Sequence, residues 1–337
     1  MKYNKYRKLG NTSKEIFPIG LGAMSFTDFY GNCEEYQAAE VLNTCLDLGV
    51  NHIDTANVYG MGLSEERIGN FLSSNGQSSK NFFSIATKAS IHRDPDTGER
   101  SFNNEGKHLE SELDKSLKRL GIECVDLFYI HRRDDKFQIE EVVTSLSNLV
   151  KKGKTKSIGF SEIAPSSLIR ASKIHQIDAV QSEYSLSTRS VEMGLLQTCK
   201  QLNTSLVAFS PVGRTLLTDR PLSFEAANRL PFLTANPRFL EPNYSENIKI
   251  TNRFRAFAKE LDVSSAALSI AWLLSKGEHV IPIPGTRSKK HLEELVAGTE
   301  IDITSEIINK IEEILPIGWA HGERYSKAQW IGPELYC

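Results

Sequence analysis

The sequence alternates short apolar runs with longer amphipathic stretches, and it does so eight times. In the intervening stretches, such as 36–49 and 108–121, apolar residues recur three and four positions apart, as in an amphipathic helix. Near-continuous apolar strands that alternate with helices are typical of a parallel sheet, because helices cover its faces. The pattern therefore predicts an α/β fold, a (β/α)8 TIM barrel, as one domain over residues 1–337. The expected strands are residues 17–24, 50–56, 82–88, 125–131, 155–161, 177–184, 205–211 and 279–285.

The alternative to a barrel is a doubly wound open sheet. That fold binds dinucleotides through a glycine-rich loop, G-x-G-x-x-G, which follows an early strand. The nearest approach here is "GLGAM" at 20–24, and it is too short for that motif. The barrel is therefore favoured.

Three segments fall outside the repeat of strands and helices. Residues 5–17 are expected to form a polar hairpin before the first strand, and residues 213 to about 245 a long excursion punctuated by prolines. The tail from Pro316 onward carries aromatic residues without helical periodicity. Long excursions from a compact barrel are usually functional. We expect long loops after strands 4 and 7, with the tail over the active-site face.

Composition excludes several classes of protein. The formal net charge of −2 provides no general attraction to nucleic acid or to an anionic membrane. No window approaches the length of apolar sequence that a membrane span needs, and the basic N-terminus lacks the apolar run of a signal peptide. The five cysteines have no metal-like spacing and are expected to be reduced thiols. The sequence thus predicts a soluble, cytoplasmic protein, and it does not predict the oligomeric state.

Chemically useful residues stand at the ends of successive strands. Asp54 ends the second strand, Lys88 the third and His131 the fourth, and Tyr59 follows in the turn after Asp54. An aspartate at such a place often caps the next helix. The next helix, however, is expected to start near Ser64, so Asp54 is not needed as its cap. Because the active site of a parallel barrel lies at the carboxyl ends of its strands, we expect these four side chains to converge.

The four groups together suit the protonation of a carbonyl oxygen. A tyrosine is a poor acid near neutral pH, but a neighbouring ammonium favours the phenolate and lowers its pKa. A carboxylate beside Lys88 keeps the ammonium charged and in place, and a histidine can orient the carbonyl oxygen. The sequence therefore predicts Tyr59, Lys88, Asp54 and His131 as a catalytic group, with no metal.

These residues carry a family resemblance. "DTANVYG" (54–60), "IATK" (85–88) and "LFYIH" (127–131), with "GFSE", "QSEYS", "FSPVGR" and "IPIPGTR" in the same order, resemble the aldo-keto reductase family along nearly the whole chain. The resemblance implies a nicotinamide cofactor bound without a Rossmann domain, and reduction of an aldehyde or ketone. By this likeness Tyr59 is the general acid, Lys88 and Asp54 tune it, and His131 orients the carbonyl.

The resemblance also implies the cofactor site. Ser161 and Gln181 are expected to hold the carboxamide, and Phe209 to stack on the nicotinamide ring. Two segments can cradle phosphates: the loop after the seventh strand, and the turn after the eighth strand, which leads into a helix N-terminus. Thr286, Arg287 and Lys289 are candidates for an adenosine 2′-phosphate, so NADPH is favoured, and NADH stays possible. The full set of expected cofactor residues is Gly22, Ser161, Gln181, Phe209, Ser210, Pro211, Val212, Gly213, Arg214, Leu216, Gly285, Thr286, Arg287, Lys289, His291 and Glu294.

The substrate is predicted less closely than the chemistry. Met24, Phe29 and Tyr30, after the first strand, suggest a partly aromatic pocket for a small carbonyl compound. The motifs most resemble the subgroup of pyridoxal reductases and plant auxin-induced-like reductases. Two alternatives stay open: a Schiff-base aldolase that uses Lys88, and a non-catalytic subunit that senses nicotinamide nucleotides. Neither the physiological substrate nor the direction of the reaction follows from the sequence.

Overall fold

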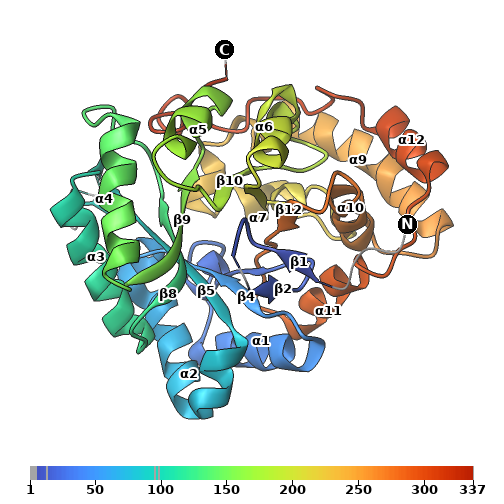
Figure 1. The fold of residues 1–337 in the computed structure, drawn as a ribbon. Coiled ribbons are helices and arrows are strands. Elements are labelled where there is room, and N and C mark those ends of the chain that lie inside the picture. Colours follow the sequence, from blue (N-terminus) through green and yellow to red (C-terminus); the bar gives the residue numbers. More distant parts are fainter. Residues whose placement is uncertain (1–5, 13, 95, 98, 337) are drawn as a thin grey trace.

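Eight parallel strands curl into one sheet in the computed structural model, which describes residues 6–336 except 13, 95 and 98 (Figure 1). The strand order is β12-β11-β10-β9-β8-β5-β4-β3, and a parallel bridge between Gly22 and Gly285 joins its two edges. All eight predicted strands are confirmed, and the fold is the predicted (β/α)8 barrel. The strands are β3 (Leu21–Gly22), β4 (His52–Asp54), β5 (Ser84–Ala89), β8 (Val125–Ile130), β9 (Thr155–Ser161), β10 (Ala179–Glu183), β11 (Ser205–Phe209) and β12 (Val280–Pro282).

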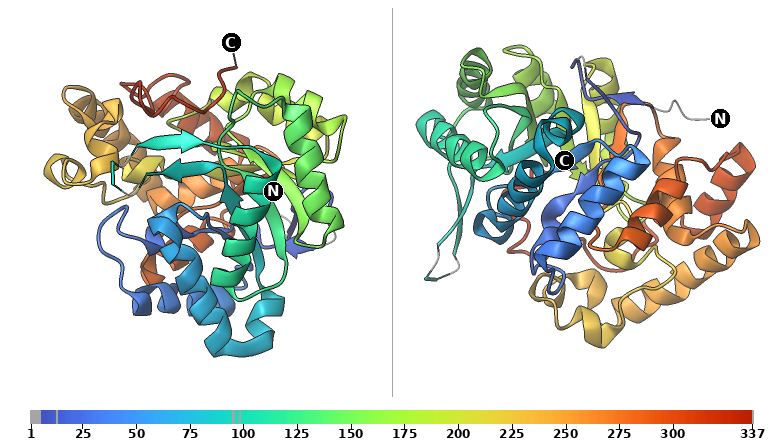
Figure 2. Two further views of the ribbon diagram at one scale, coloured as in Figure 1. Left: turned by 90° about the vertical axis from the view of Figure 1, so that its left-hand side faces the viewer. Right: turned by 90° about the horizontal axis from the view of Figure 1, so that it is seen from below.

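Helices surround the sheet and bury its outer face (Figures 1 and 2). Their apolar stripes pack on the strands in one large core, and α1 and α3 end at Gly49 and Gly121 in the left-handed conformation that glycine favours. The longer helices are α1 (Glu35–Leu48), α2 (Leu63–Phe82), α3 (Gly106–Leu120), α4 (Ile139–Lys151), α5 (Pro165–Ser172), α6 (Leu195–Gln201), α9 (Asn243–Glu260), α10 (Ser265–Leu274), α11 (Lys289–Ala297) and α12 (Ser305–Ile314).

The predicted N-terminal hairpin is present as β1 (Arg7–Lys8) and β2 (Glu15–Ile16), which pair antiparallel. Its apolar residues Leu9 and Ile16 belong to the same cluster as Leu127 and Val207, which come from β8 and β11. The hairpin therefore closes one end of the barrel interior, and Figure 1 looks toward that end.

The other end of the barrel carries the long connections. The excursion 210–242 after β11 holds η4 (Gly213–Thr215), α7 (Phe224–Ala227), α8 (Pro231–Thr234) and η5 (Pro237–Phe239), and it has a small core of its own. The tail beyond α12 has no helix or strand among its described residues. It lies against the excursion, because Asn236 donates to the carbonyl of Arg324 and Gln329 donates to the carbonyl of Phe232. The connection after β8, residues 131–138, is longer than an ordinary strand-to-helix loop.

One element at this rim was not predicted. The connection after β5 contains an antiparallel hairpin of β6 (Ile91–Arg93) and β7 (Arg100–Phe102), which projects from the barrel (Figure 2). Its strands are short and mostly polar, so they lack the apolar run that revealed the barrel strands. Within the described residues, no helix has the length and apolar character needed to cross a membrane.

Candidate active site

The four predicted catalytic residues come from three neighbouring strands. Asp54 is the last residue of β4, Lys88 lies in β5, and His131 follows β8 directly. Tyr59 opens η2 (Tyr59–Gly62), the turn that leads from β4 to α2. Asp54, Lys88 and His131 are buried, whereas Tyr59 as a residue is partly exposed.

The ammonium of Lys88 is the centre of this arrangement. Its Nζ is ion-paired with Asp54 Oδ1, and it donates to the carbonyl of Thr55 at 2.7 Å and to the hydroxyl of Tyr59 at 3.5 Å. Burial by itself lowers the pKa of Lys88, but the attraction of Asp54 outweighs it and the pKa is raised. Lys88 is therefore a fixed positive charge beside the phenol.

Tyr59 differs from the expectation in one respect. Burial raises the pKa of the phenol, and the neighbouring Lys88 offsets this only in part, so the pKa lies above its ordinary value. The expected lowering was wrong in net direction, because the loss of water disfavours the phenolate more than an ammonium already paired with Asp54 favours it. Tyr59 thus stays protonated at neutral pH, which is the state that a proton donor needs.

His131 lies against Tyr59, with their ring centroids 5.7 Å apart. Burial lowers the pKa of His131 well below its usual value, and the positive charges of Arg132, Lys88 and Arg100 act in the same direction. The imidazole is therefore neutral near pH 7. Its Nδ1 is buried and has no hydrogen-bond partner among the described residues, so the ring is held by packing.

Gln181 and Ser161 stand beside this group. The amide of Gln181 donates to Asp54 Oδ2 at 2.7 Å, so that Lys88 and Gln181 each bond one carboxylate oxygen. Ser161 Oγ accepts from Arg132 Nη1 at 3.0 Å. Both side chains are buried, Ser161 at the end of β9 and Gln181 within β10. Phe209, which ends β11, is partly exposed beside the barrel interior.

The loop after β11 has an unusual backbone. Ser210, Gly213, Arg214 and Thr215 all have positive φ, between 51° and 83°. Such values are costly for residues other than glycine, and runs of them occur where backbone amides form an anion-binding concavity. The guanidinium of Arg214 is buried and donates to both carboxylate oxygens of Glu183, at 3.1 and 2.8 Å. The Arg214 side chain is therefore engaged by Glu183 and holds this loop from within.

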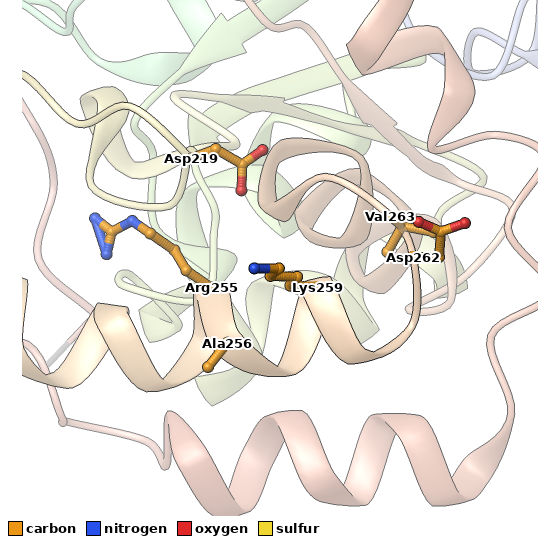
Figure 3. A pocket seen from close by; sticks show the side chains of 6 residues that line it. All are labelled: Asp219, Arg255, Ala256, Lys259, Asp262 and Val263. Carbon is orange, nitrogen blue, oxygen red and sulfur yellow. The ribbon is translucent and has the colours of Figure 1, made fainter.

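A surface cleft of about 470 Å³ lies behind this loop (Figure 3). Arg255 reaches from α9 to donate to the carbonyls of Leu216 and Thr218, at 3.2 and 2.9 Å, and Asp219 accepts from Ser265 at the start of α10. Two acids and two bases line the cleft in near balance: Asp219, Asp262, Arg255 and Lys259. The cleft contains none of the four predicted catalytic residues, and Arg255 supports the end of the loop from outside.

The second expected cradle follows β12. Here Gly22 and Gly285 meet where the barrel closes, and a Cβ on Gly22 would lie 2.8 Å from the carbonyl oxygen of Ile283, so no larger residue fits. Thr286 is buried and Lys289, the first residue of α11, is exposed. Arg287 donates to the carbonyls of Gly31 and Asn32, and so it ties this turn to the loop after β3.

The three expected substrate residues are partly exposed. Phe29 packs on Tyr30 at 5.2 Å and on Phe232 of the excursion at 4.9 Å between ring centroids. Met24 lies in η1 (Ala23–Phe26). These contacts bring the loop after β3 against the loop after β11.

Sequence reasoning missed a network of charges at this rim. Glu183, which ends β10, is buried among Arg214, Arg238 and Arg324, and Glu162, which follows β9, is paired with Arg324 from the tail. Glu162 lies in the motif GFSE and Glu183 in the motif QSEYS, but the sequence predicted no role for either glutamate. Their position directly after apolar strands was the same signal that revealed Asp54.

Comparison with known proteins agrees with this geometry. The model of the aldo/keto reductase family matches residues 18–316. The chain belongs to the aldo/keto reductase family. It is therefore an oxidoreductase of the class that acts on carbonyl groups, as the sequence predicted.

Relatives of this aldo/keto reductase match it end to end. It is 34% identical to the aldo-keto reductase yakc [NADP(+)] of Schizosaccharomyces pombe, over 95% of this chain and 94% of that one. It is 35% identical to the probable aldo-keto reductase 1 of Glycine max, over 94% and 91% of the two chains.

Solved structures share the fold. The glycerol dehydrogenase from Gluconobacter oxydans aligns with a TM-score of 0.82 and 24% identity, over 92% of this chain and 95% of that one. An aldo-keto reductase from Bacillus halodurans in its holo form aligns with a TM-score of 0.76 and 22% identity, over 96% and 98%.

Proposed function

We propose that this aldo/keto reductase reduces an aldehyde or ketone to the alcohol with NADPH. The observation that carries the proposal is the set of contacts around Lys88, whose ammonium binds Asp54, the Thr55 carbonyl and the Tyr59 hydroxyl beside a neutral His131. This arrangement holds a protonated phenol and a permanent positive charge at one point of the barrel rim.

Each residue has a role in that reaction. A carbonyl oxygen within reach of Tyr59 and His131 accepts a hydrogen bond from the phenol and one from the neutral imidazole. The nicotinamide, when bound, supplies the hydride. As the oxygen gains charge, Tyr59 gives up its proton, and Lys88 stabilises the phenolate that remains. Asp54 keeps the ammonium in place, and Gln181 fixes the carboxylate.

The chain's own residues fit a dinucleotide phosphate. The positive-φ loop from Ser210 to Thr215 provides backbone amides for the pyrophosphate, and the turn at Thr286 and Arg287, before the N-terminus of α11, suits an adenosine 2′-phosphate. Ser161 and Gln181 would hold the carboxamide, and Phe209 would stack on the ring. The name of the S. pombe relative includes NADP(+), which supports NADPH. Use of NADH stays possible.

The aldolase alternative is disfavoured by Lys88. A Schiff-base lysine must be a neutral amine with a lowered pKa, whereas Lys88 has a raised pKa and three acceptors around its Nζ. The non-catalytic nucleotide sensor differs from a reductase in having no turnover, so an activity assay separates the two.

Within the described residues the thiols Cys33, Cys45, Cys124 and Cys199 are free, which fits the proposed cytoplasmic location.

A substrate panel tests the proposal. Purified protein is mixed with aldehydes, ketones and pyridoxal, with NADPH or NADH in turn, and cofactor oxidation is followed by absorbance. We expect turnover with NADPH and a simple aldehyde. Borohydride trapping without cofactor, followed by mass spectrometry, provides the second arm. A carbonyl adduct on Lys88 would contradict the reductase proposal, and binding of NADPH without any turnover would favour the nucleotide sensor.

A further inference from the structure

Two arginines approach the catalytic group from the side of the β6–β7 hairpin. Arg132 follows His131 in the chain and is only 9% exposed. Its Nη1 donates to the His131 carbonyl at 2.6 Å and to Ser161 Oγ at 3.0 Å, and its buried Nε has no partner among the described residues. Arg100 lies on β7, and its Nη2 donates to the tail carbonyls of Ala328 and Ile331, at 3.2 and 2.7 Å.

The hairpin, the tail and Arg132 meet at Gly332. A Cβ on Gly332 would lie 2.8 Å from the ring of Phe102 and 3.2 Å from the Cβ of Arg132. The guanidinium of Arg100 lies over the Phe102 ring, 5.2 Å from its centroid. Arg100 and Arg132 therefore border the same part of the rim, and both act electrostatically on His131.

The charges elsewhere at this rim are compensated. Lys88 has Asp54, Arg214 has Glu183, and Arg324 has Glu162. These carboxylates are occupied: Asp54 bonds Lys88 and Gln181, whereas Glu162 bonds Arg324 and the backbone amide of Glu183.

Arg100 and Arg132 differ from these pairs. In the part of the chain that the structure describes, neither has a carboxylate oxygen within ion-pair distance. Burial lowers the pKa of Arg100, and Arg132 lowers it further, so the two charges repel one another. The groups that act on His131 from β5, β7 and its own loop are all cationic: Arg132, Lys88 and Arg100. Arg132 is buried and Arg100 is partly exposed, and a buried guanidinium donor without a partner, as Arg132 Nε is among the described residues, is unfavourable.

We propose that the substrate carries a carboxylate, which Arg132 and Arg100 bind while Tyr59 and His131 hold its carbonyl oxygen. The substrate class is then that of aldehydo or keto acids. A planar carboxylate matches the fork of hydrogen-bond donors that a guanidinium presents. This inference rests on the proposed function, because it places the anion in the same pocket as the reacting carbonyl.

The test compares acids with their neutral esters. The substrates are 3- and 4-carboxybenzaldehyde and the corresponding methyl esters, assayed with NADPH at low ionic strength. We expect kcat/KM to be at least about tenfold higher for one of the acids than for its ester, the effect of one charge-assisted bond. Equal values for acid and ester would overturn the inference and leave the proposed function intact. No oxidation of NADPH with any of the four aldehydes would count against the proposed function instead.

Variants and a binding measurement complete the design. Arg100→Met should bring the ratio of kcat/KM for the acid to that for the ester close to one. Arg93→Met, which removes a charge from the paired position on β6, should keep the ratio.

Calorimetry of the complex with NADP⁺ measures binding without turnover. 3- and 4-(hydroxymethyl)benzoate, the products of the two acids, are each compared with their methyl esters. Tighter binding of at least one of the acids than of its ester is expected, and equal binding for both pairs contradicts the carboxylate site. A ratio unchanged in Arg100→Met would also contradict it.

Discussion

The two sides of the barrel rim are built differently. On the side of β4, β5 and β8, Asp54, Lys88 and His131 are delivered by the strands themselves, and Asp54 and Lys88 from neighbouring strands are ion-paired. On the side of β9, β10 and β11, Glu162 and Glu183 are paired with arginines from the excursion and the tail, up to 162 positions away. The first side is fixed by the sheet, whereas the second depends on long segments that must dock.

We propose that the first side carries the chemistry, and that the second side holds the excursion and the tail in place. Substitutions among the strand-delivered residues should remove catalysis while the excursion and the tail stay docked. Substitutions in the glutamate–arginine network should destabilise the docked segments, and with them the loop from Ser210 to Thr215, before they affect the chemistry.

The largest expected effect is that of Lys88→Met. Loss of the ammonium removes the stabilisation of the Tyr59 phenolate, and reduction should fall by roughly a thousandfold, in the range of a lost acid–base contribution. Lys88→Arg should also be impaired, since a planar guanidinium cannot place a point charge in the same space. The measurement is kcat with NADPH and an aldehyde. Lys80→Met, at a partly exposed lysine that bonds the Gly121 carbonyl, is the control. Activity within tenfold of wild type would remove Lys88 from the mechanism.

The next effect is one of stability. Glu183→Gln leaves Arg214 and the neighbouring arginines without their central carboxylate, and breaking a buried pair of this kind costs about 3–5 kcal/mol in the free energy of unfolding. Denaturant unfolding measures it. Glu140→Gln removes an equally two-pronged contact with Arg170, but on the surface, and should change stability little. Similar effects of the two variants would mean that the network does not hold the docked segments.

The comparison also shows what the sequence can predict. The eight strands were found because strands buried on both faces carry mostly apolar residues, as β8 and β11 do. The convergence of Asp54, Lys88 and His131 was predicted because a strand end fixes where a side chain emerges. The β6–β7 hairpin and the partners of Glu183 were missed, because polar strands and contacts between distant segments leave no local pattern. The raised pKa of Tyr59 was missed because burial is a property of the folded chain.

A smaller effect concerns cofactor choice. Arg287→Ala removes one charge-assisted contact with the proposed 2′-phosphate, so the Kd of NADPH should rise roughly tenfold or more, and that of NADH much less. Fluorescence titration gives both constants, and Lys290→Ala, at the exposed neighbour on α11, is the control. Equal weakening for both cofactors would mean that Arg287 acts only through its bonds to Gly31 and Asn32.

The smallest effect is expected from pH. The pKa of Tyr59 is raised from its usual value near 10, and that of His131 is lowered well below its usual value near 6.5. Both groups therefore keep their working protonation state between about pH 7 and 9, and kcat/KM for reduction should be level there. A profile of kcat/KM against pH checks this. A clear loss of activity with a midpoint near pH 8 would show that Tyr59 or His131 titrates in the working range.

The most direct test of the account is Tyr59→Phe, measured for binding and chemistry in the same preparation. The substitution removes only the hydroxyl that Lys88 contacts, while the proposed cofactor cradles lie on other loops. We predict a Kd for NADPH within about twofold of wild type, and a loss of kcat of at least about a hundredfold. A variant that binds NADPH normally and keeps more than a few per cent of wild-type kcat would contradict the role of Tyr59 as the proton donor.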